Sequence, residues 1–219
     1  MKRKDVRARI EEIGIIPAVR VRSKEDAVFA ASAVHRAGIS IAEITTTFSG
    51  ALDAIAELRK SVPEMIVGAG TILDKDMAKR CVQAGAQFLT SPGLVLEVVE
   101  FAKAEDVVVF PGALTPSEII AAWKAGADFV KIFPCAPLGG DHYIQALKRP
   151  FSQVPLIASG GVNQQTARGF LLAGAAALGI GSELIPNESI YKRQEDRIRE
   201  LSRRFMKILQ DARKRNVVQ

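Results

Sequence analysis

A repeated pattern limits the possible folds most strongly: a helix-like segment ends at Ala-Gly and an apolar run follows. The pattern occurs four times, as HRAGISIAEI, VQAGAQFLTS, WKAGADFVKI and LLAGAAALGI. Glycine adopts the left-handed conformation that often ends an α-helix, so each Ala-Gly pair predicts a helix end before a strand. The four glycines, at positions 38, 85, 126 and 174, are 47, 41 and 48 residues apart. These intervals are too long for one strand and one helix, so we expect a further strand in each.

Further apolar runs supply the missing strands, at 65–71 (MIVGAGT), 107–113 (VVVFPGA) and 155–161 (PLIASGG), and a run before the first glycine, at 15–21 (IIPAVRV), brings the number of strands to eight. Short apolar strands that alternate with helices indicate parallel βαβ units. Eight such units close into a (β/α)8 TIM barrel, which we predict as a single domain over the whole chain, 1–219. The main alternative is an open doubly wound sheet, but its glycine-rich fingerprint after the first strand is replaced here by AVRVRSKEDA.

We also expect a helix before the first strand and an amphipathic helix at the C-terminal end. Apolar side chains recur there at helical spacing, at Ile198, Leu201, Phe205, Ile208 and Ala212. The net charge of +6 lies in this part, because residues 192–215 hold ten of the 30 Lys and Arg but four of the 24 Asp and Glu. We interpret these charges as the solvated face of the last helix. Nucleic-acid binding is disfavoured, because the one aromatic residue of the segment lies on its apolar stripe.

Nothing in the sequence indicates export or membrane insertion. The basic residues of MKRKDVRARIEEIG precede no apolar segment. No run approaches the roughly 18 apolar residues that a membrane span needs. Cys81 and Cys135 form neither a disulfide framework nor the spacing of metal ligands. We therefore expect a cytoplasmic protein with two free thiols, no metal site and no membrane partner.

The repeat also places charged residues inside the barrel. Five residues past the four glycines stand Glu43, Thr90, Lys131 and Gly179, which are equivalent positions near the C-terminal ends of alternate strands. Alternate strands of such a barrel contribute side chains to one interior layer, so Glu43 and Lys131 should face each other. Strand alternation agrees, because it puts Phe129 and Phe133 on the same face as Lys131.

A lysine and a glutamate near the mouth of a barrel have two interpretations. They can form a partly buried ion pair, which adds little stability because desolvation opposes the attraction. Alternatively they are catalytic, because barrel active sites lie at this end of the strands. Desolvation lowers the pKa of a lysine, and the free amine attacks a ketone to form an imine. A nearby carboxylate then moves protons for that imine. We favour the catalytic interpretation.

The other strand ends suit a small anionic substrate. The glycine-rich segments ASGGVN (158–163) and GIGSEL (179–184) follow the seventh and eighth strands, where barrels commonly bind phosphate through backbone N–H groups. Arg20, at the end of the first strand, is a candidate clamp for a carboxylate or a phosphate. Thr71, after VGAG, is a candidate donor at the mouth. The alternatives are a surface ion pair for Arg20 and an ordinary strand-end hydroxyl for Thr71.

Five segments, VGAGT, TSPG, VFPGALTPSE, ADFVKIFP and SGGV, occur in this order along the chain. In them the chain resembles the family of aldolases that cleave 2-keto-3-deoxy-6-phosphogluconate (KDPG) and 4-hydroxy-2-oxoglutarate (KHG), over about residues 12 to 205. The resemblance implies a class I, metal-independent aldolase without a cofactor, built on a (β/α)8 barrel and assembled as a homotrimer. It also implies cleavage of a 2-keto acid to pyruvate and an aldehyde such as glyceraldehyde 3-phosphate.

The resemblance implies a role for each matched residue. Lys131 matches the Schiff-base lysine, and Glu43, in EIT, matches the general acid and base. The matches to the substrate pocket are Arg20, Thr71, Ser91, Pro92, Pro111, Phe133 and Ser159, and the matches to the phosphate site are Gly160, Gly161, Gly181 and Ser182.

Two positions depart from the family pattern. Many members carry an arginine four residues after the glutamate, where it holds the substrate carboxylate, but this chain has Thr47. Other members have an arginine at the end of strand one, so we expect Arg20 to be the substitute. The usual TGG after strand seven reads Ser159-Gly160-Gly161 here.

Because both departures touch the pocket, three substrates stay open: KDPG, its epimer 2-keto-3-deoxy-6-phosphogalactonate, and KHG. Two more distant alternatives also remain. One is a phosphate-binding barrel isomerase or synthase without Schiff-base chemistry. The other is a non-catalytic scaffold that binds nucleic acid through its basic C-terminal helix.

Overall fold

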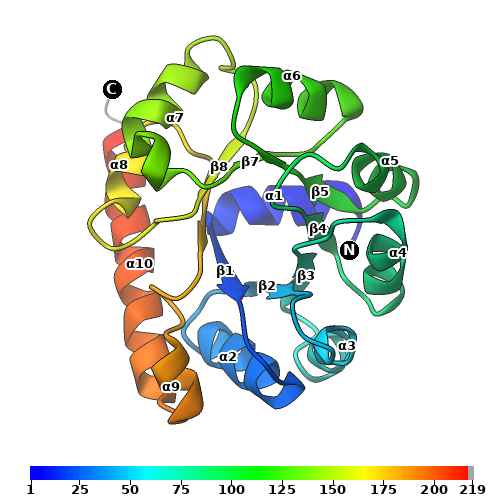
Figure 1. Cartoon of the computed structure of the whole chain (residues 1–219). Coiled ribbons are helices and arrows are strands. Elements are labelled where there is room, and N and C mark those ends of the chain that lie inside the picture. The colour runs from blue at the N-terminus through cyan, green and yellow to red at the C-terminus, as the bar shows by residue number, and fades with distance from the viewer. Residues whose placement is uncertain (217–219) are drawn as a thin grey trace.

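The computed structural model of the protein describes residues 1–216, so 217–219 of the predicted domain lie outside the described residues. Strands and helices alternate along this range, and Figure 1 shows the helices arranged around the outside of the strands. The strands are β1 Ile15–Val19, β2 Ile41–Thr45, β3 Ile66–Gly70, β4 Phe88–Thr90, β5 Val108–Phe110, β6 Gly112–Ala113, β7 Val130–Ile132, β8 Leu156–Ser159 and β9 Ala177–Ile180. The helices are α1 Arg3–Ile13, α2 Lys24–Arg36, α3 Ala51–Ser61, α4 Lys75–Gln83, α5 Leu96–Ala104, α6 Pro116–Ala125, the 3-10 helix η1 Ala136–Leu138, α7 Gly140–Lys148, α8 Ala167–Leu172, α9 Asn187–Tyr191 and α10 Glu195–Asn216.

The strands form one parallel sheet that curls into a nearly closed barrel. Their order is β5-β4-β3-β2-β1-β9-β8-β7-β6. The strands at the two ends of this order, β5 and β6, are separated in the chain by one residue. The first and last strands of the sheet are therefore neighbours in space. This arrangement confirms the predicted (β/α)8 barrel, with its N-terminal helix and its long C-terminal helix.

The predicted strand 107–113 is divided in two by Pro111. Proline lacks a backbone N–H and interrupts the hydrogen bonding of a strand. The first half, β5, pairs with β4, and the second half, β6, pairs with β7. The Pro111 carbonyl still accepts the Lys131 N–H at 2.9 Å, so the break does not detach β7 from its neighbour. The nine strands thus occupy the eight positions that the sequence predicts.

The repeat glycines end helices as predicted. Gly38, Gly85, Gly126 and Gly174 have φ values of 105°, 103°, 97° and 98°, which glycine adopts without strain. They follow α2, α4, α6 and α8, and a strand begins within four residues of each. The strand begins three or four residues after each glycine, and this similar spacing explains why a fixed count from each glycine reaches one level of the barrel.

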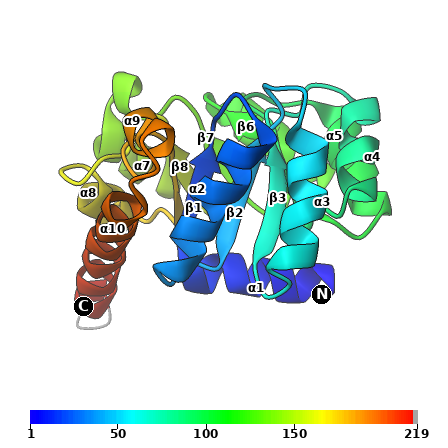
Figure 2. The same cartoon turned by 90° about the horizontal axis from the view of Figure 1, so that it is seen from below.

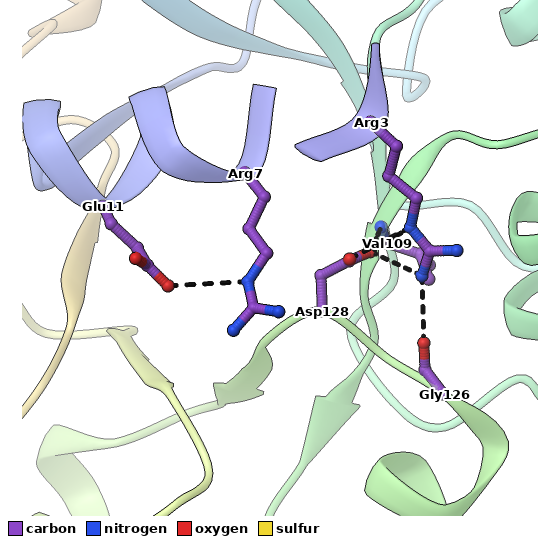
Figure 3. Close-up of polar contacts among 6 residues, drawn as sticks. All are labelled: Arg3, Arg7, Glu11, Val109, Gly126 and Asp128. Atoms are coloured by element: carbon purple, nitrogen blue, oxygen red, sulfur yellow. Dashed lines mark hydrogen bonds and ion pairs between the residues drawn. The ribbon is translucent and has the colours of Figure 1, made fainter. Parts of the chain in front are cut away.

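Helix α1 lies across the N-terminal ends of the strands, as Figure 2 shows, and a largely buried ion pair fixes it there. Arg3 Nε donates to Asp128 Oδ1 at 3.0 Å, and Arg3 Nη2 donates to Asp128 Oδ2 and to the Gly126 carbonyl, both at 3.0 Å (Figure 3). Asp128 Oδ2 also accepts the Val109 N–H at 2.8 Å. The Asp128 carboxylate therefore links α1 and β5 to the segment that leads into β7.

Helix α10 packs against α2 and α8, and its apolar stripe is wider than the predicted one by Leu209. The predicted residues Ile198, Leu201, Phe205 and Ala212 are buried. Ile208 is partly buried and packs against the core, and Leu209 beside it is fully part of the core. Contacts with two helices widen the stripe, and position 209 lies one turn from both 205 and 212. Within residues 1–216, no helix has the length and apolar character needed to cross a membrane.

We predict that Asp128→Ala lowers the free energy of unfolding by about 3 kcal/mol, because it leaves Arg3 and the Val109 N–H without their buried partner. Urea denaturation of the variant and the wild type measures this difference. Glu12→Ala is the matched control, because it breaks the exposed Arg9–Glu12 pair. That variant should lose less than about 0.5 kcal/mol. Equal losses in the two variants would show that Asp128 does not fasten the barrel.

Candidate active site

Lys131 and Glu43 meet inside the barrel. Lys131 comes from β7 and Glu43 from β2, and Lys131 Nζ lies 3.6 Å from Glu43 Oε2. The two residues are 8% and 3% exposed. The prediction that these side chains face each other in one layer is confirmed. A charged pair this deep needs a specific reason, because desolvation offsets most of its attraction.

The space for this pair comes from a missing side chain, and its base is aromatic. A Cβ added to Gly70 would lie 1.9 Å from Glu43 Oε1, so only glycine leaves room for that carboxylate. Towards the other end of the barrel, Phe88 stacks on Phe110 with centroids 5.1 Å apart, and Phe110 meets Phe129 edge to face at 6.1 Å. All three rings are buried, so this part of the barrel interior is apolar.

A cavity of about 430 Å³ opens above the pair at the C-terminal ends of the strands. Most of the predicted site residues line it: Arg20, Glu43, Thr71, Pro92, Lys131, Phe133, Ser159, Gly160, Gly161, Gly181 and Ser182. The structure thus brings together residues from seven segments of the sequence that are far apart. Lys131 Nζ also lies 5.6 Å from the centroid of the Phe133 ring, whose face attracts a cation.

Two predicted pocket residues are not among the described residues that line the cavity. The Ser91 hydroxyl is turned into its own loop, where it donates to the Gly93 carbonyl at 2.6 Å. Pro111 lies at the break between β5 and β6, and its carbonyl is used by Lys131. Both residues support the wall rather than form its surface.

The end of the cavity beside β8 and β9 offers free backbone donors. The N–H groups of Gly160, Gly161, Gly181 and Ser182 donate to no residue in the described range 1–216. Gly160 and Gly161 have φ values of 84° and 85°, and a Cβ on Gly161 would lie 2.2 Å from that of Ala136. Glycine is therefore required there, and convergent N–H groups of this kind suit an anion.

Arg20 lies just past the end of β1, not within it, and its side chain is exposed. It lines both this cavity and a neighbouring groove on the side of α9. Arg20 forms no ion pair with any residue whose side chain the structure describes, so the alternative of a surface ion pair finds no support. Thr47, where the resemblance leads one to expect arginine, is exposed, and its hydroxyl lies 3.0 Å from Thr45 Oγ1.

Sequence reasoning missed the lining residues Ala18, Ile185 and Asn187, and it did not name as site residues three that lie in the glycine-rich segments after strands seven and eight: Val162, Gly179 and Glu183. Ala18 could have been found, because it is two residues from Arg20 and alternation puts both on one face. Asn187 begins α9 and reaches the cavity only through the path of the chain after β9. No periodic signal in the sequence marks that path.

Cys135 follows β7 closely but does not act as a competing nucleophile in this arrangement. Burial raises the pKa of its thiol to about 12, so it stays protonated near neutral pH. Cys81 is buried as well, and burial raises the pKa of its thiol to about 12. In the part of the chain that the structure describes, no three His, Cys, Asp or Glu side chains gather as metal ligands.

Comparison with known proteins gives one consistent family. The sequence model of the family described as KDPG and KHG aldolase matches residues 6–201. The KHG/KDPG aldolase of Escherichia coli strain K12 is 35% identical over 189 residues, which are 86% of this chain and 89% of that protein. The 2-dehydro-3-deoxy-phosphogluconate aldolase of Treponema pallidum is 32% identical over 200 residues, covering 91% of this chain and 95% of that protein.

A solved structure with the same fold carries chemical information. It is the KDPG aldolase from Legionella pneumophila with pyruvate captured at low pH as a covalent carbinolamine intermediate. It superimposes on this chain with a TM-score of 0.84 at 30% identity, covering 90% of this chain and 95% of that one.

We predict that Gly70→Ala destabilises the protein by about 1–3 kcal/mol, because the new methyl group overlaps the Glu43 carboxylate. Urea denaturation measures the change, and a crystal structure of the variant should show Glu43 displaced from Lys131. Gly181→Ala is the control, because a Cβ there meets nothing within 4 Å. It should change stability by no more than about 0.5 kcal/mol. A Gly70→Ala variant as stable as the control would contradict this account of the space around Glu43.

Proposed function

The chain belongs to the KDPG and KHG aldolase family, and we propose that it cleaves a 4-hydroxy-2-keto acid through a Schiff base on Lys131. As a member it is a class I aldolase, a lyase of carbon–carbon bonds. The observation that carries the residue assignment is the 3.6 Å approach of Lys131 Nζ to Glu43 Oε2 within the cavity. It brings a nucleophile and a proton carrier together beside backbone N–H groups that can bind an anion. The carbinolamine trapped in the Legionella enzyme is the adduct that precedes such a Schiff base.

Lys131 begins the reaction. Its amine attacks C2 of the keto acid and forms a carbinolamine, whose hydroxyl then leaves as water. The product is a protonated imine in which the lysine nitrogen is doubly bonded to C2. This positive nitrogen accepts the electron pair that the next step releases.

Glu43 moves the protons, through a bridging water. It takes the proton of the C4 hydroxyl, so that C4 and its oxygen become the carbonyl of the leaving aldehyde. The electrons of the C3–C4 bond form the C2–C3 double bond of an enamine and neutralise the nitrogen. Glu43 then returns a proton to C3, and hydrolysis of the imine releases pyruvate and the free amine.

We predict that sodium borohydride with pyruvate reduces an adduct onto Lys131, which peptide mass spectrometry locates. Lys148 is an internal control, because burial lowers the pKa of its amine but it lies outside the cavity. The adduct should be absent from Lys148, since a free amine alone is not sufficient. Lys131→Ala should stay folded and lose turnover by roughly 10⁴-fold or more. Full cleavage activity in that variant would rule out the Schiff-base assignment.

The substrate we propose is KDPG, whose distal phosphate would bind the free N–H groups beside β8 and β9. Arg20 supports this placement, because β1 is hydrogen-bonded to β9 and Arg20 follows β1. We therefore propose that Arg20 holds the distal anion. The expectation that Arg20 replaces the arginine missing at Thr47, and so holds the keto-acid carboxylate, is the alternative role for this residue, and KHG and the galactonate epimer stay alternatives as substrates.

We predict that Arg20→Met lowers kcat/KM for KDPG by roughly 10- to 100-fold, the usual effect of losing a charge-assisted hydrogen bond. For the same keto acid without its phosphate, kcat/KM should change less than about twofold. Arg22→Met removes the same charge from a residue that lines only the neighbouring groove, so it controls for long-range charge. Equal losses on both substrates would instead assign Arg20 to the keto-acid carboxylate.

We further propose that the protein is a homotrimer and works in the cytoplasm. The exposed apolar side chains of Leu96 on α5, Ile120 on α6 and Leu138 on η1 support assembly, because subunit interfaces use such surface. The two buried free thiols suit a reducing compartment.

A further inference from the structure

Thr71, in the wall of the cavity, has a backbone conformation that its side chain disfavours. Its φ is 63°, in the left-handed region, where a β-branched residue is strained. A conformation of this kind persists only when the surrounding structure holds it in place. The contacts around Thr71 should therefore show what holds it.

Thr46, at the end of the neighbouring strand β2, makes those contacts. Its hydroxyl lies 3.1 Å from the carbonyl oxygen of Gly70 and 3.1 Å from that of Thr71 itself. The backbone N–H of Thr46 also donates to the Gly70 carbonyl, at 2.9 Å. On the other side, the Ile72 N–H donates to the Thr90 carbonyl at 3.1 Å. The peptide groups before and after Thr71 are thus both anchored.

The donors of Thr71 itself stay free. Within residues 1–216, neither its backbone N–H nor its hydroxyl donates to another residue. Thr71 shares the cavity with Lys131 and Glu43, and it lies on β3's side of Glu43, away from Arg20 on β1. An anion on this side of the Schiff base meets two neutral donors, because position 47 carries no arginine.

We propose that Thr46 is a positioning residue for the aldolase reaction. Its hydroxyl holds Thr71, which matches a family residue near the carboxylate end of the substrate, in the left-handed conformation that leaves its N–H and hydroxyl free to bind that carboxylate. The inference rests on the proposed function, since it takes the keto acid to be bound at Lys131. Thr46 itself touches neither the substrate nor the reacting atoms.

The test is Thr46→Val, which keeps the shape of the side chain and removes the hydroxyl. KM for KDPG should rise roughly threefold to tenfold, the usual range for one lost hydrogen bond. The kcat value should fall less than about twofold, because the carboxylate is bound equally before and during bond cleavage. Thr46→Ser restores the hydroxyl and should bring KM back to within about twofold of the wild type.

Thr45→Val is the matched control. The Thr45 hydroxyl ties the same strand end to β1, where it donates to the Val19 carbonyl at 3.1 Å, and it does not contact Thr71. Its KM should stay close to that of the wild type. If Thr45→Val raises KM as much as Thr46→Val does, or if Thr46→Ser fails to restore KM, the effect is a general loosening and the proposal is overturned.

Two further readouts separate this inference from the proposed function. Amide hydrogen exchange of a peptide covering 66–73 should be faster in Thr46→Val than in the wild type and normal in Thr46→Ser. Borohydride trapping with pyruvate should still label Lys131 in every variant. Normal labelling with unchanged exchange and KM overturns the role of Thr46 alone. Absence of labelling in the wild type overturns the proposed function, and the carboxylate role of Thr71 with it.

Discussion

The position of Lys131 depends on how β7 is joined to its neighbours, because this strand has only three residues. On one side β7 pairs regularly with β8. On the other side the ladder is interrupted at Pro111, and separate bonds close it: Lys131 N–H to the Pro111 carbonyl, Phe133 N–H to the Ala113 carbonyl, and Asp128 to Val109. Since Asp128 is also the partner of Arg3, helix α1 at the far end of the barrel helps to position the strand that carries Lys131.

The charged pair of Lys131 and Glu43 at the centre of the barrel depends on other contacts for its stability. Two buried charges gain little from each other once desolvation is counted. The missing side chain at Gly70, which admits Glu43, also removes apolar contacts from the core. The stacked rings beneath the pair and the helices around the strands supply the burial that the mouth lacks. Stability and chemistry are thus assigned to opposite ends of the strands, the usual division in this fold.

Sequence periodicity was sufficient for features that repeat and insufficient for those that occur once. The count from each helix-ending glycine predicted the pairing of Lys131 with Glu43, because every unit has the same path from helix to strand. The sequence did not show which way Ser91 points, since a loop hydroxyl turns to its nearest acceptor. The place of Asn187 in the cavity and the left-handed backbone conformation of Thr71 were missed for a similar reason. Both depend on single contacts between distant segments, which neither hydrophobic spacing nor residue type encodes.

Three consecutive threonines, Thr45 to Thr47, stand two residues after Glu43 and fix the mouth of the barrel around it. Thr45 ties the end of β2 to β1, and Thr46 ties it to the turn after β3, so the mouth is held from both sides. Because the donors on this side are neutral, Lys131 is the one cation within ion-pair distance of Glu43 among the residues whose side chains are described. Adding an arginine here would introduce a second cation near that carboxylate. In the proposed mechanism the protonated imine keeps the positive charge of the Lys131 nitrogen beside Glu43, so the carboxylate that takes the C4 proton retains its cationic neighbour. In the proposed arrangement, the side chain that binds the keto-acid carboxylate differs from those that set the environment of the base Glu43. Binding of the substrate can therefore be altered without altering the base.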